Sequence, residues 1–343
     1  FINMESFKRP HILFVFSLTF LPFATSAQAI TLGNSHDSIA VIAGHDSGAF
    51  AQKFCVDYYK PKNYTSSSPV VIYIHERNSS GEQSSVLQDI ADRRGALLIA
   101  PTMTVNSDWF HSGKHSCWCF ASIIKQLYKH AAARENRKDI PVYLTGFSAG
   151  GEFVARYMLI RQVMPDSVPI KMAVSVNADS YIFCTDSLNG IEMKYPCGIL
   201  DGNILPGSLC RNIQPVPVTL NHILQDYSEN YGILIGAADT TNTIGCESVQ
   251  GANRYERAKM FYSFSTDNAI KRGSLLQWKY DSVLGAGNYA YSMYNAKRNV
   301  TDTLTIAETL LFETQWHPVL RITTGQNSTT SLFATTETNT KKA

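Results

Sequence analysis

The sequence predicts an α/β fold in which a mostly parallel central sheet carries helices on both faces. Strand-like and helix-like segments alternate along most of the chain. Some of the strand-like segments, such as residues 69–74, are almost wholly apolar, as expected of strands in a parallel sheet that is covered on both faces. A third observation is a strand at residues 140–145 that leads through Gly146-Phe147-Ser148-Ala149-Gly150 directly into a helix.

Size and composition favour one large domain. The chain has 343 residues, of which 44% are hydrophobic, enough for a sizeable core. Basic and acidic residues are scattered and leave a net charge of +2, so neither nucleic acid nor an acidic substrate is expected as a partner. We find no nucleotide-binding motif and no Cys/His spacing typical of zinc. The sequence therefore predicts no cofactor and no metal.

The N-terminal residues are typical of a secretory signal peptide. Lys8 and Arg9 precede a short apolar run at residues 12–23, and Ala27-Gln28-Ala29 has the form that signal peptidase cleaves after. We therefore expect a signal peptide at residues 1–29 and a secreted or periplasmic protein; a retained anchor is the alternative. No later stretch is long and apolar enough for a membrane span. The Thr/Ser-rich tail at residues 323–343 is expected to be disordered.

Seven cysteines fit an oxidising compartment, in which disulfide bonds are stable. Cys184, Cys197 and Cys210 lie in one irregular stretch, and we expect a disulfide between two of them. Cys117 and Cys119 are too close in sequence to pair easily. Because the number is odd, at least one thiol stays free or pairs between chains.

The order of elements follows from apolar runs for the strands and from apolar residues at helical spacing for the helices. Within one domain at residues 30–322, we expect strands at 38–43, 54–59, 69–74, 96–101, 140–145, 170–176, 232–236 and 276–283. We expect helices at 83–94, 120–131, 152–164, 254–263 and 304–312. Residues 177–217, rich in proline and cysteine, interrupt this alternation after the sixth strand and predict an insertion that forms a lid or a pocket wall.

Ser148 is the predicted nucleophile. Small residues on both sides allow the chain to turn so sharply that the serine oxygen stands exposed between strand and helix, the nucleophile-elbow arrangement. An ordinary Gly-Ser loop is the alternative, but the flanking strand and helix favour the elbow. An oxyanion hole would then use the amide of Ala149 and that of Glu76 or Arg77, in the loop after residues 69–74. We expect His75 in this loop to have a structural role.

A serine nucleophile needs a base, and the base needs a carboxylate to orient it. Asp239 follows the strand at residues 232–236 and is the preferred acid, with Asp226 and Asp281 as rivals. The turn Gly285-Ala286-Gly287 should then present a histidine, but the next residue is Asn288. An asparagine amide cannot accept and return a proton at neutral pH.

With these motifs, residues 54–312 resemble secreted α/β-hydrolases related to poly(3-hydroxyalkanoate) depolymerases and feruloyl esterases. The matching segments are residues 74–81, 145–151, 180–181, 195–198, 236–240, 250–258 and 283–293. In such relatives a histidine follows the last Gly-x-Gly, so the resemblance implies that Ser148 and Asp239 keep their roles while Asn288 occupies the position of the base. Glu76 stands where these relatives usually carry glycine.

Other histidines could replace the missing base. His317 follows the helix at residues 304–312, and His111 and His115 lie in an aromatic loop that either lines a substrate pocket or packs on the surface; His222 precedes the strand of the acid. The first hypothesis is an exported serine hydrolase of carboxylic esters, impaired by Asn288. The alternatives are a binding protein on a hydrolase scaffold that has lost its chemistry, and an active enzyme in which Asn288 is an introduced change.

Overall fold

The computed structural model describes residues 28–43, 50–103, 119–163, 168–200, 203–204, 216–242 and 247–313. Residues 1–27 of the predicted signal peptide and the predicted tail at residues 323–343 lie outside the described residues. The same holds for Cys210, for the aromatic loop with His111 and His115, and for His317.

Eight strands of the described residues form one sheet in the order β1-β2-β4-β3-β5-β6-β11-β12. β2 runs antiparallel to β1 and β4, and the neighbours from β4 to β12 are parallel to one another. The strands are β1 (Gly33–Ala43), β2 (Phe50–Lys60), β3 (Val70–Ile74), β4 (Leu97–Thr102), β5 (Val142–Phe147), β6 (Ile170–Val176), β11 (Tyr231–Gly236) and β12 (Lys279–Val283). This topology confirms the predicted α/β class.

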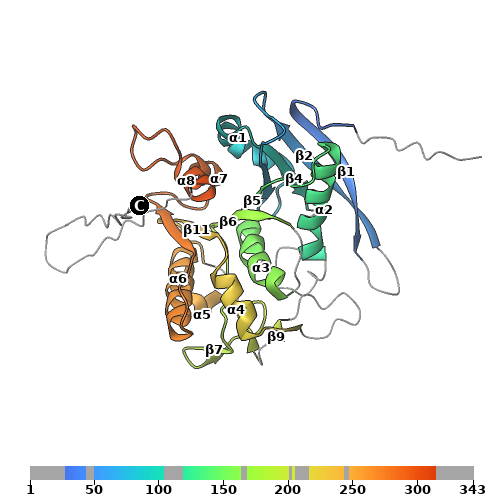
Figure 1. The fold of residues 1–343 in the computed structure, drawn as a ribbon. Coiled ribbons are helices and arrows are strands. Elements are labelled where there is room, and N and C mark those ends of the chain that lie inside the picture. Colours follow the sequence, from blue (N-terminus) through green and yellow to red (C-terminus); the bar gives the residue numbers. More distant parts are fainter. Residues whose placement is uncertain are drawn as a thin grey trace, which may run out of the picture.

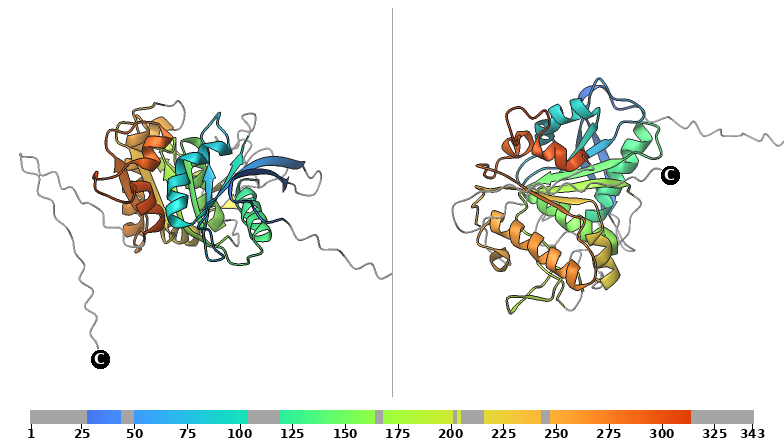
Figure 2. Two further views of the ribbon diagram at one scale, coloured as in Figure 1. Left: turned by 90° about the horizontal axis from the view of Figure 1, so that it is seen from above. Right: turned by 60° about the vertical axis from the view of Figure 1, so that its left-hand side comes forward.

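Helices cover both faces of the sheet, as Figures 1 and 2 show. On one face lie α2 (Cys119–Arg134), α3 (Ala149–Val163), α4 (Leu220–Tyr227), α5 (Glu247–Gln250) and α6 (Arg254–Lys271). On the other lie η1 (Gly81–Leu87), α1 (Gln88–Arg94), α7 (Ala290–Asn295) and α8 (Ile306–Phe312). Each face has its own cluster of buried apolar side chains, because successive side chains of a strand point to opposite faces.

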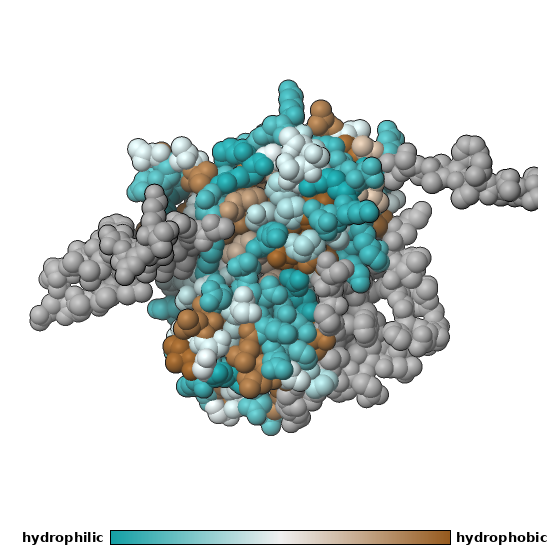
Figure 3. Space-filling model, in the orientation of Figure 1, coloured by the Kyte–Doolittle hydropathy of each residue, from teal (hydrophilic) through white to brown (hydrophobic). Residues whose placement is uncertain are grey.

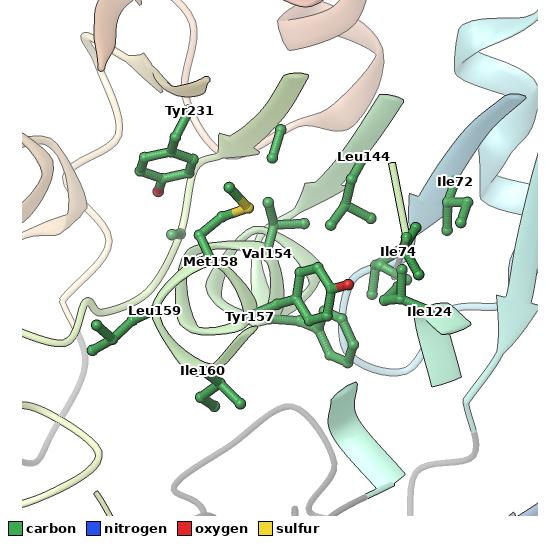
Figure 4. Close-up of a cluster of buried hydrophobic side chains, with 14 of the residues drawn as sticks. Ile72, Ile74, Ile124, Leu144, Val154, Tyr157, Met158, Leu159, Ile160 and Tyr231 are labelled. Atoms are coloured by element: carbon green, nitrogen blue, oxygen red, sulfur yellow. The ribbon is translucent and has the colours of Figure 1, made fainter. Parts of the chain in front are cut away.

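Helix α3 packs against the middle of the sheet. Most of its side chains are buried, and in the close-up of Figure 4 Val154 and Met158 point toward the strand side, where Leu144 of β5 lies. A helix that is apolar on nearly all sides is typical of the interior of a protein. Its N-terminus therefore has a fixed position relative to β5 and β6.

The structure differs from the expected elements where side chains make contacts that the pattern does not reveal. Residues 83–94, expected as one helix, form η1 and then α1, because Gln83 accepts hydrogen bonds from Tyr73 and from the Glu76 amide instead of facing solvent. Helix α6 continues to Lys271, beyond the expected end at residue 263. Three short helices, α4, α5 and α7, were not expected. Thr219 and His222 form a capping box at the start of α4, which the sequence does not reveal because a histidine stands where the usual pattern has Glu or Gln.

Helix α8, the last described helix, is held to α1 by ion pairs to a buried carboxylate. The Glu308 carboxylate of α8 is fully buried and accepts from Arg93 Nη2 at 2.7 Å and from Arg94 Nε at 2.7 Å. Arg94 also pairs with Glu313 at 2.6 Å. Removing one partner of a buried ion pair leaves an uncompensated charge, so these contacts fix α8 against α1.

The insertion after the sixth strand contains two small hairpins in its described part, β7 (Ser187–Leu188) with β8 (Ile191–Glu192), and β9 (Asn203–Ile204) with β10 (Val216–Pro217). Phe183 packs on two rings of α6, Phe261 and Phe264, with centroid distances of 5.2 and 5.1 Å. Cys184 is a buried free thiol, which removes it from the three candidates for the predicted disulfide. The predicted lid role of this segment stays a prediction.

The face of the molecule in Figure 3 is mostly hydrophilic, with smaller groups of apolar side chains near its lower edge. Large apolar side chains that are exposed include Ile270, at the end of α6, and Leu275, after it. Scattered exposed apolar residues are normal for a globular protein. Among the described residues, no helix has both the length and the apolar character that a membrane span requires.

A cap substitution tests the start of α6, which carries Arg254. Asn253 Oδ1 accepts a hydrogen bond of 2.9 Å from the Glu256 amide. We expect Asn253→Ala to lower the free energy of unfolding by about 1 kcal/mol, because a helix N-terminal amide loses its acceptor. Asn253→Ser, which keeps an acceptor, should lower the free energy of unfolding by only a few tenths of that amount. Equal losses in both variants, measured by urea denaturation, would contradict the capping role.

Candidate active site

The chain makes a tight turn at Ser148, between β5 and α3. Ser148 has φ 55°, in the left-handed region that non-glycine residues seldom adopt. A Cβ atom at Gly150 would overlap the carbonyl oxygen of Ile74 and lie 2.7 Å from that of His75. A Cβ at Gly151 would overlap the Val176 carbonyl oxygen. The glycines therefore allow the backbone to approach β3 and β6 closely, as the predicted elbow requires.

Hydrogen bonds fix this turn to the neighbouring strand. The Ser148 amide donates to Val176 O of β6 at 2.9 Å, and Ser148 O accepts from the Glu152 amide at 2.9 Å as α3 begins. The residue is 5% exposed, at the carboxyl end of a central parallel strand. In open parallel sheets ligands bind outside the carboxyl ends of the strands. Ser148 thus lies at the edge of the sheet where substrates of such folds bind.

The three candidate acids lie at different positions in the sheet. Asp239 follows β11 at the carboxyl edge, on the same side as Ser148. Asp226 is buried in α4, before β11, and its carbonyl accepts from the Trp278 ring nitrogen; burial raises the pKa of its carboxyl well above the usual value. Asp281 lies inside β12 and pairs with Arg298. Of the three, Asp239 has the position that a catalytic acid needs.

The Asp239 carboxylate is fully buried and has two oxygens in different surroundings. Oδ1 accepts from the Thr241 amide at 3.1 Å. Oδ2 has no hydrogen-bond partner among the described residues, and Arg254 Nη1 lies 3.7 Å away. Arg254 is itself buried and pairs through Nε with Asp179. The sequence did not point to Arg254 as a neighbour of the acid, because α6 and β11 meet only in the folded chain.

Asn288 lies in the loop after β12, the strand next to β11. This loop packs against the one that carries Asp239: the Ala238 amide donates to Ala286 O at 2.9 Å, and the Ala237 amide donates to Val283 O at 2.9 Å. Asn288 is exposed at this edge. The structure therefore places the loops of Asp239 and Asn288 in contact, as adjacent parallel strands with Gly236 opposite Val283 require.

Sequence reasoning missed Asn177, which follows β6 directly and is fully buried. Its side chain bonds to the loops after both β11 and β12, accepting from the Gly236 amide at 2.8 Å and donating to Gly287 O at 3.0 Å. These partners are 59 and 110 residues away in the sequence. The only local signal is an asparagine directly after a buried strand, a residue type that tolerates left-handed backbone.

The predicted oxyanion residues lie around the start of α3. Ala149 is the first residue of the helix, where amides lack an acceptor within the helix and favour negative charge. Glu76 and Arg77 follow β3, which contacts the turn through the close approach of Gly150 to Ile74 O. The Glu76 amide donates to Gln83 Oε1 at 3.0 Å, so Gln83 already occupies this candidate donor.

His75 holds the loop after β3. Its Nδ1 is 2.6 Å from Glu76 O, and its Nε2 is 2.8 Å from the Met103 amide. The amide must donate, so Nε2 is unprotonated and Nδ1 carries the proton that goes to Glu76 O. Burial lowers the pKa of this imidazole, which favours the neutral ring. These contacts fit the structural role expected for His75.

The other described histidines lie away from this edge of the sheet or serve local structure. His222 takes part in the capping box of α4. His130 is half-buried on α2 and stacks on Tyr58 with a centroid distance of 6.1 Å. Within the described ranges, no three His, Cys, Asp or Glu side chains are arranged to hold a metal ion.

Comparisons with protein-family models and with curated proteins found no match. Solved structures do resemble the chain. The poly(3-hydroxybutyrate) depolymerase LpqC from Bordetella parapertussis matches with a TM-score of 0.62 and 22% identity over 77% of this chain and 87% of that chain. Poly(aspartic acid) hydrolase-1 from Sphingomonas sp. KT-1 matches with a TM-score of 0.63 and 20% identity over 77% of this chain and 96% of that chain. At these identities the similarity is one of fold.

Proposed function

We propose that this chain, which has the α/β-hydrolase fold, is an exported serine hydrolase of carboxylic esters. Asn288 would reduce its turnover. The observation that carries the proposal is the turn at Ser148, with its left-handed backbone and the glycines that pack against β3 and β6. A backbone strained in this way is rarely kept without a function. The buried Asp239 at the same edge of the sheet adds support.

The proposed reaction passes through an acyl-enzyme. Ser148 Oγ would attack the ester carbonyl carbon, and the amides of Ala149 and Arg77 would stabilise the negative oxygen of the tetrahedral intermediate, since Gln83 already accepts from the Glu76 amide. The bond to the alcohol oxygen would then break, and water would hydrolyse the acyl-serine. A base normally takes the serine proton and gives it to the leaving alcohol. Asn288 cannot do so, and solvent would have to accept and supply this proton.

The substrate class is part of the proposal. The depolymerase LpqC is named for a polyester. We propose ester hydrolysis for this chain as well, with a polyester, an aryl ester or a lipid as the substrate. Export follows from the predicted signal peptide at residues 1–29, ahead of the proposed domain at residues 30–322 and the predicted tail at residues 323–343. A disulfide at Cys197 is in keeping with an oxidising compartment.

The second candidate function is ligand binding without catalysis. Asn288 favours it, because an asparagine in the position of the base removes proton transfer while leaving the pocket intact. In this case the protein would bind an ester or a carboxylic acid and release it unchanged. The two candidates differ in whether Ser148 is nucleophilic.

A fluorophosphonate probe separates the candidates. We expect slow labelling at Ser148, located by mass spectrometry of the modified peptide, because the oxyanion amides and the elbow remain while the base is missing. Ser148→Ala should abolish the labelling, and Ser228→Ala, which removes an exposed serine at the end of α4, should leave it unchanged. Labelling as fast as in complete serine hydrolases would mean that another histidine acts as base. No labelling at Ser148 would favour the binding protein.

A further inference from the structure

Asn177 is a non-glycine residue in a left-handed conformation, with φ 48°, at the carboxyl end of β6. It is fully buried, whereas Asn136, another left-handed asparagine, is exposed after α2. A buried amide side chain has to satisfy both its oxygen and its nitrogen within the protein. At Asn177 the partners that do so belong to the two loops of the candidate site.

Three hydrogen bonds connect Asn177 to these loops and to β11. Its backbone amide donates to Leu234 O at 2.9 Å, its Oδ1 accepts from the Gly236 amide at 2.8 Å, and its Nδ2 donates to Gly287 O at 3.0 Å. Gly236 ends β11 three residues before Asp239, and Gly287 directly precedes Asn288. The preceding residue, Val176, accepts the Ser148 amide. Val176 and Asn177 therefore form hydrogen bonds with the backbone at or near Ser148, Asp239 and Asn288.

We propose that Asn177 is a positioning residue, which holds the loops of Asp239 and Asn288 at a fixed place relative to the turn of Ser148. The proposal rests on the proposed function for its catalytic meaning, but the holding of the loops is a property of the structure alone. Catalytic groups must keep their relative positions closely, since a shift of about 1 Å can cost about 10²-fold in rate.

Few side chains can make this set of contacts. The site needs an acceptor for the Gly236 amide and a donor for Gly287 O on one short side chain, and an asparagine amide supplies both. Aspartate would keep the acceptor but place a negative oxygen against Gly287 O. Glycine would accept the left-handed backbone and lose both side-chain bonds. The variants Asn177→Asp and Asn177→Gly thus remove one or two of the contacts without adding backbone strain.

Hydrogen exchange measured by mass spectrometry on the full chain tests the holding of the loops. We expect Asn177→Gly to raise the exchange rate about 10-fold or more in peptides covering residues 236–242 and 284–289, because opening these loops no longer breaks the two side-chain hydrogen bonds of Asn177. The exchange rates in β5 and α3 should stay unchanged. Asn177→Asp should raise it mainly in residues 284–289. Asn136→Gly, the matched control, should change neither peptide. Unchanged exchange in both loops, or a rise throughout the protein, would overturn the proposal.

Kinetics in the Asn288→His background separate this proposal from the proposed function. With a short-chain nitrophenyl ester, Asn177→Gly should lower kcat about 10²-fold while KM stays within about 3-fold, because loop positions affect proton transfer more than substrate binding. A fall in stability alone would lower the fraction of active protein, which fluorophosphonate titration of Ser148 measures, and would leave kcat per labelled serine unchanged. If loop exchange rises but every variant is inactive, the loop-holding role stands and the proposed hydrolase function fails. If all variants have equal kcat, Asn177 has no positioning role.

Discussion

Replacing Asn288 by histidine is expected to raise the turnover of a short-chain nitrophenyl ester by about 10³-fold. A general base that accepts the serine proton and returns it to the leaving alcohol is worth this much in hydrolases with a serine nucleophile. The loop of Asn288 is packed against that of Asp239 through the bonds of Ala237 and Ala238, and Asn288 is exposed. A larger ring at this position therefore meets no crowded core.

The Asp239 carboxylate sets the size of this gain. Its Oδ2 lacks a hydrogen-bond donor among the described residues, which leaves an acceptor for an imidazole N–H. The same oxygen is 3.7 Å from the buried guanidinium of Arg254, so the carboxylate already faces one positive charge. A second cation, the imidazolium, would be stabilised less than beside an unpaired carboxylate. We therefore expect the gain at the lower end of the range of about 10³- to 10⁶-fold that loss of a triad member costs.

Two controls make the substitution decisive. Asn299→His introduces the same ring at an exposed position outside the site and should leave turnover unchanged. Ser148→Ala combined with Asn288→His should return turnover to the background. Equal turnover in Asn288→His with and without Ser148 would refute the assignment of both positions.

Replacing Gly150 by alanine should lower the free energy of unfolding by about 3 kcal/mol, because overpacking against backbone cannot be relieved by a rotamer change. The added Cβ would overlap the Ile74 carbonyl oxygen and lie 2.7 Å from His75 O. Ile74 ends β3, whose five residues are all buried, and His75 directly follows it. To make room, α3 would have to move away from the sheet, and fluorophosphonate labelling of Ser148 should be lost with it.

A matched glycine substitution is available in the same site. A Cβ at Gly287 would have only Ala238 O within 4 Å, at 3.8 Å, which is an ordinary contact. Gly287→Ala should therefore leave the free energy of unfolding within about 0.5 kcal/mol of the original. Urea denaturation of both variants compares them directly. Similar stabilities would mean that the turn at Ser148 has more room than the backbone positions indicate.

The sequence predicted four of the parallel strands, β3, β4, β6 and β11, well, because each is a short apolar run between turn residues. β6 was predicted at its observed bounds, and β3, β4 and β11 within one residue at each end. The elbow at Ser148 and the place of Asp239 after β11 followed from motif and order. Whether these residues and Asn288 act as proposed remains to be tested by the substitutions above.

What the sequence could not predict depends on contacts between distant residues. Arg254 meets Asp239 and Asp179 only after α6 has packed beside β11, and no pattern around residue 254 indicates a buried ion pair. Gln83 was expected only as the first residue of a helix, but its side-chain oxygen accepts from the Glu76 amide and the Tyr73 hydroxyl. Both are polar residues whose contacts form only in the tertiary structure. The local periodicity of the sequence therefore does not predict them.

The ion pairs of Glu308 with Arg93 and Arg94 limit how far the protein can be shortened from its C-terminal side. They make α8 an integral part of the sheet's outer layer, although it lies near the end of the described chain. Expression vectors that shorten the protein should retain everything through Glu313, and purification handles or display anchors belong after that residue. A protein that lacks α8 would leave Arg93 and Arg94 without their carboxylate partner and would expose the apolar surface that α8 covers. We expect such a protein to be obtained in poor yield.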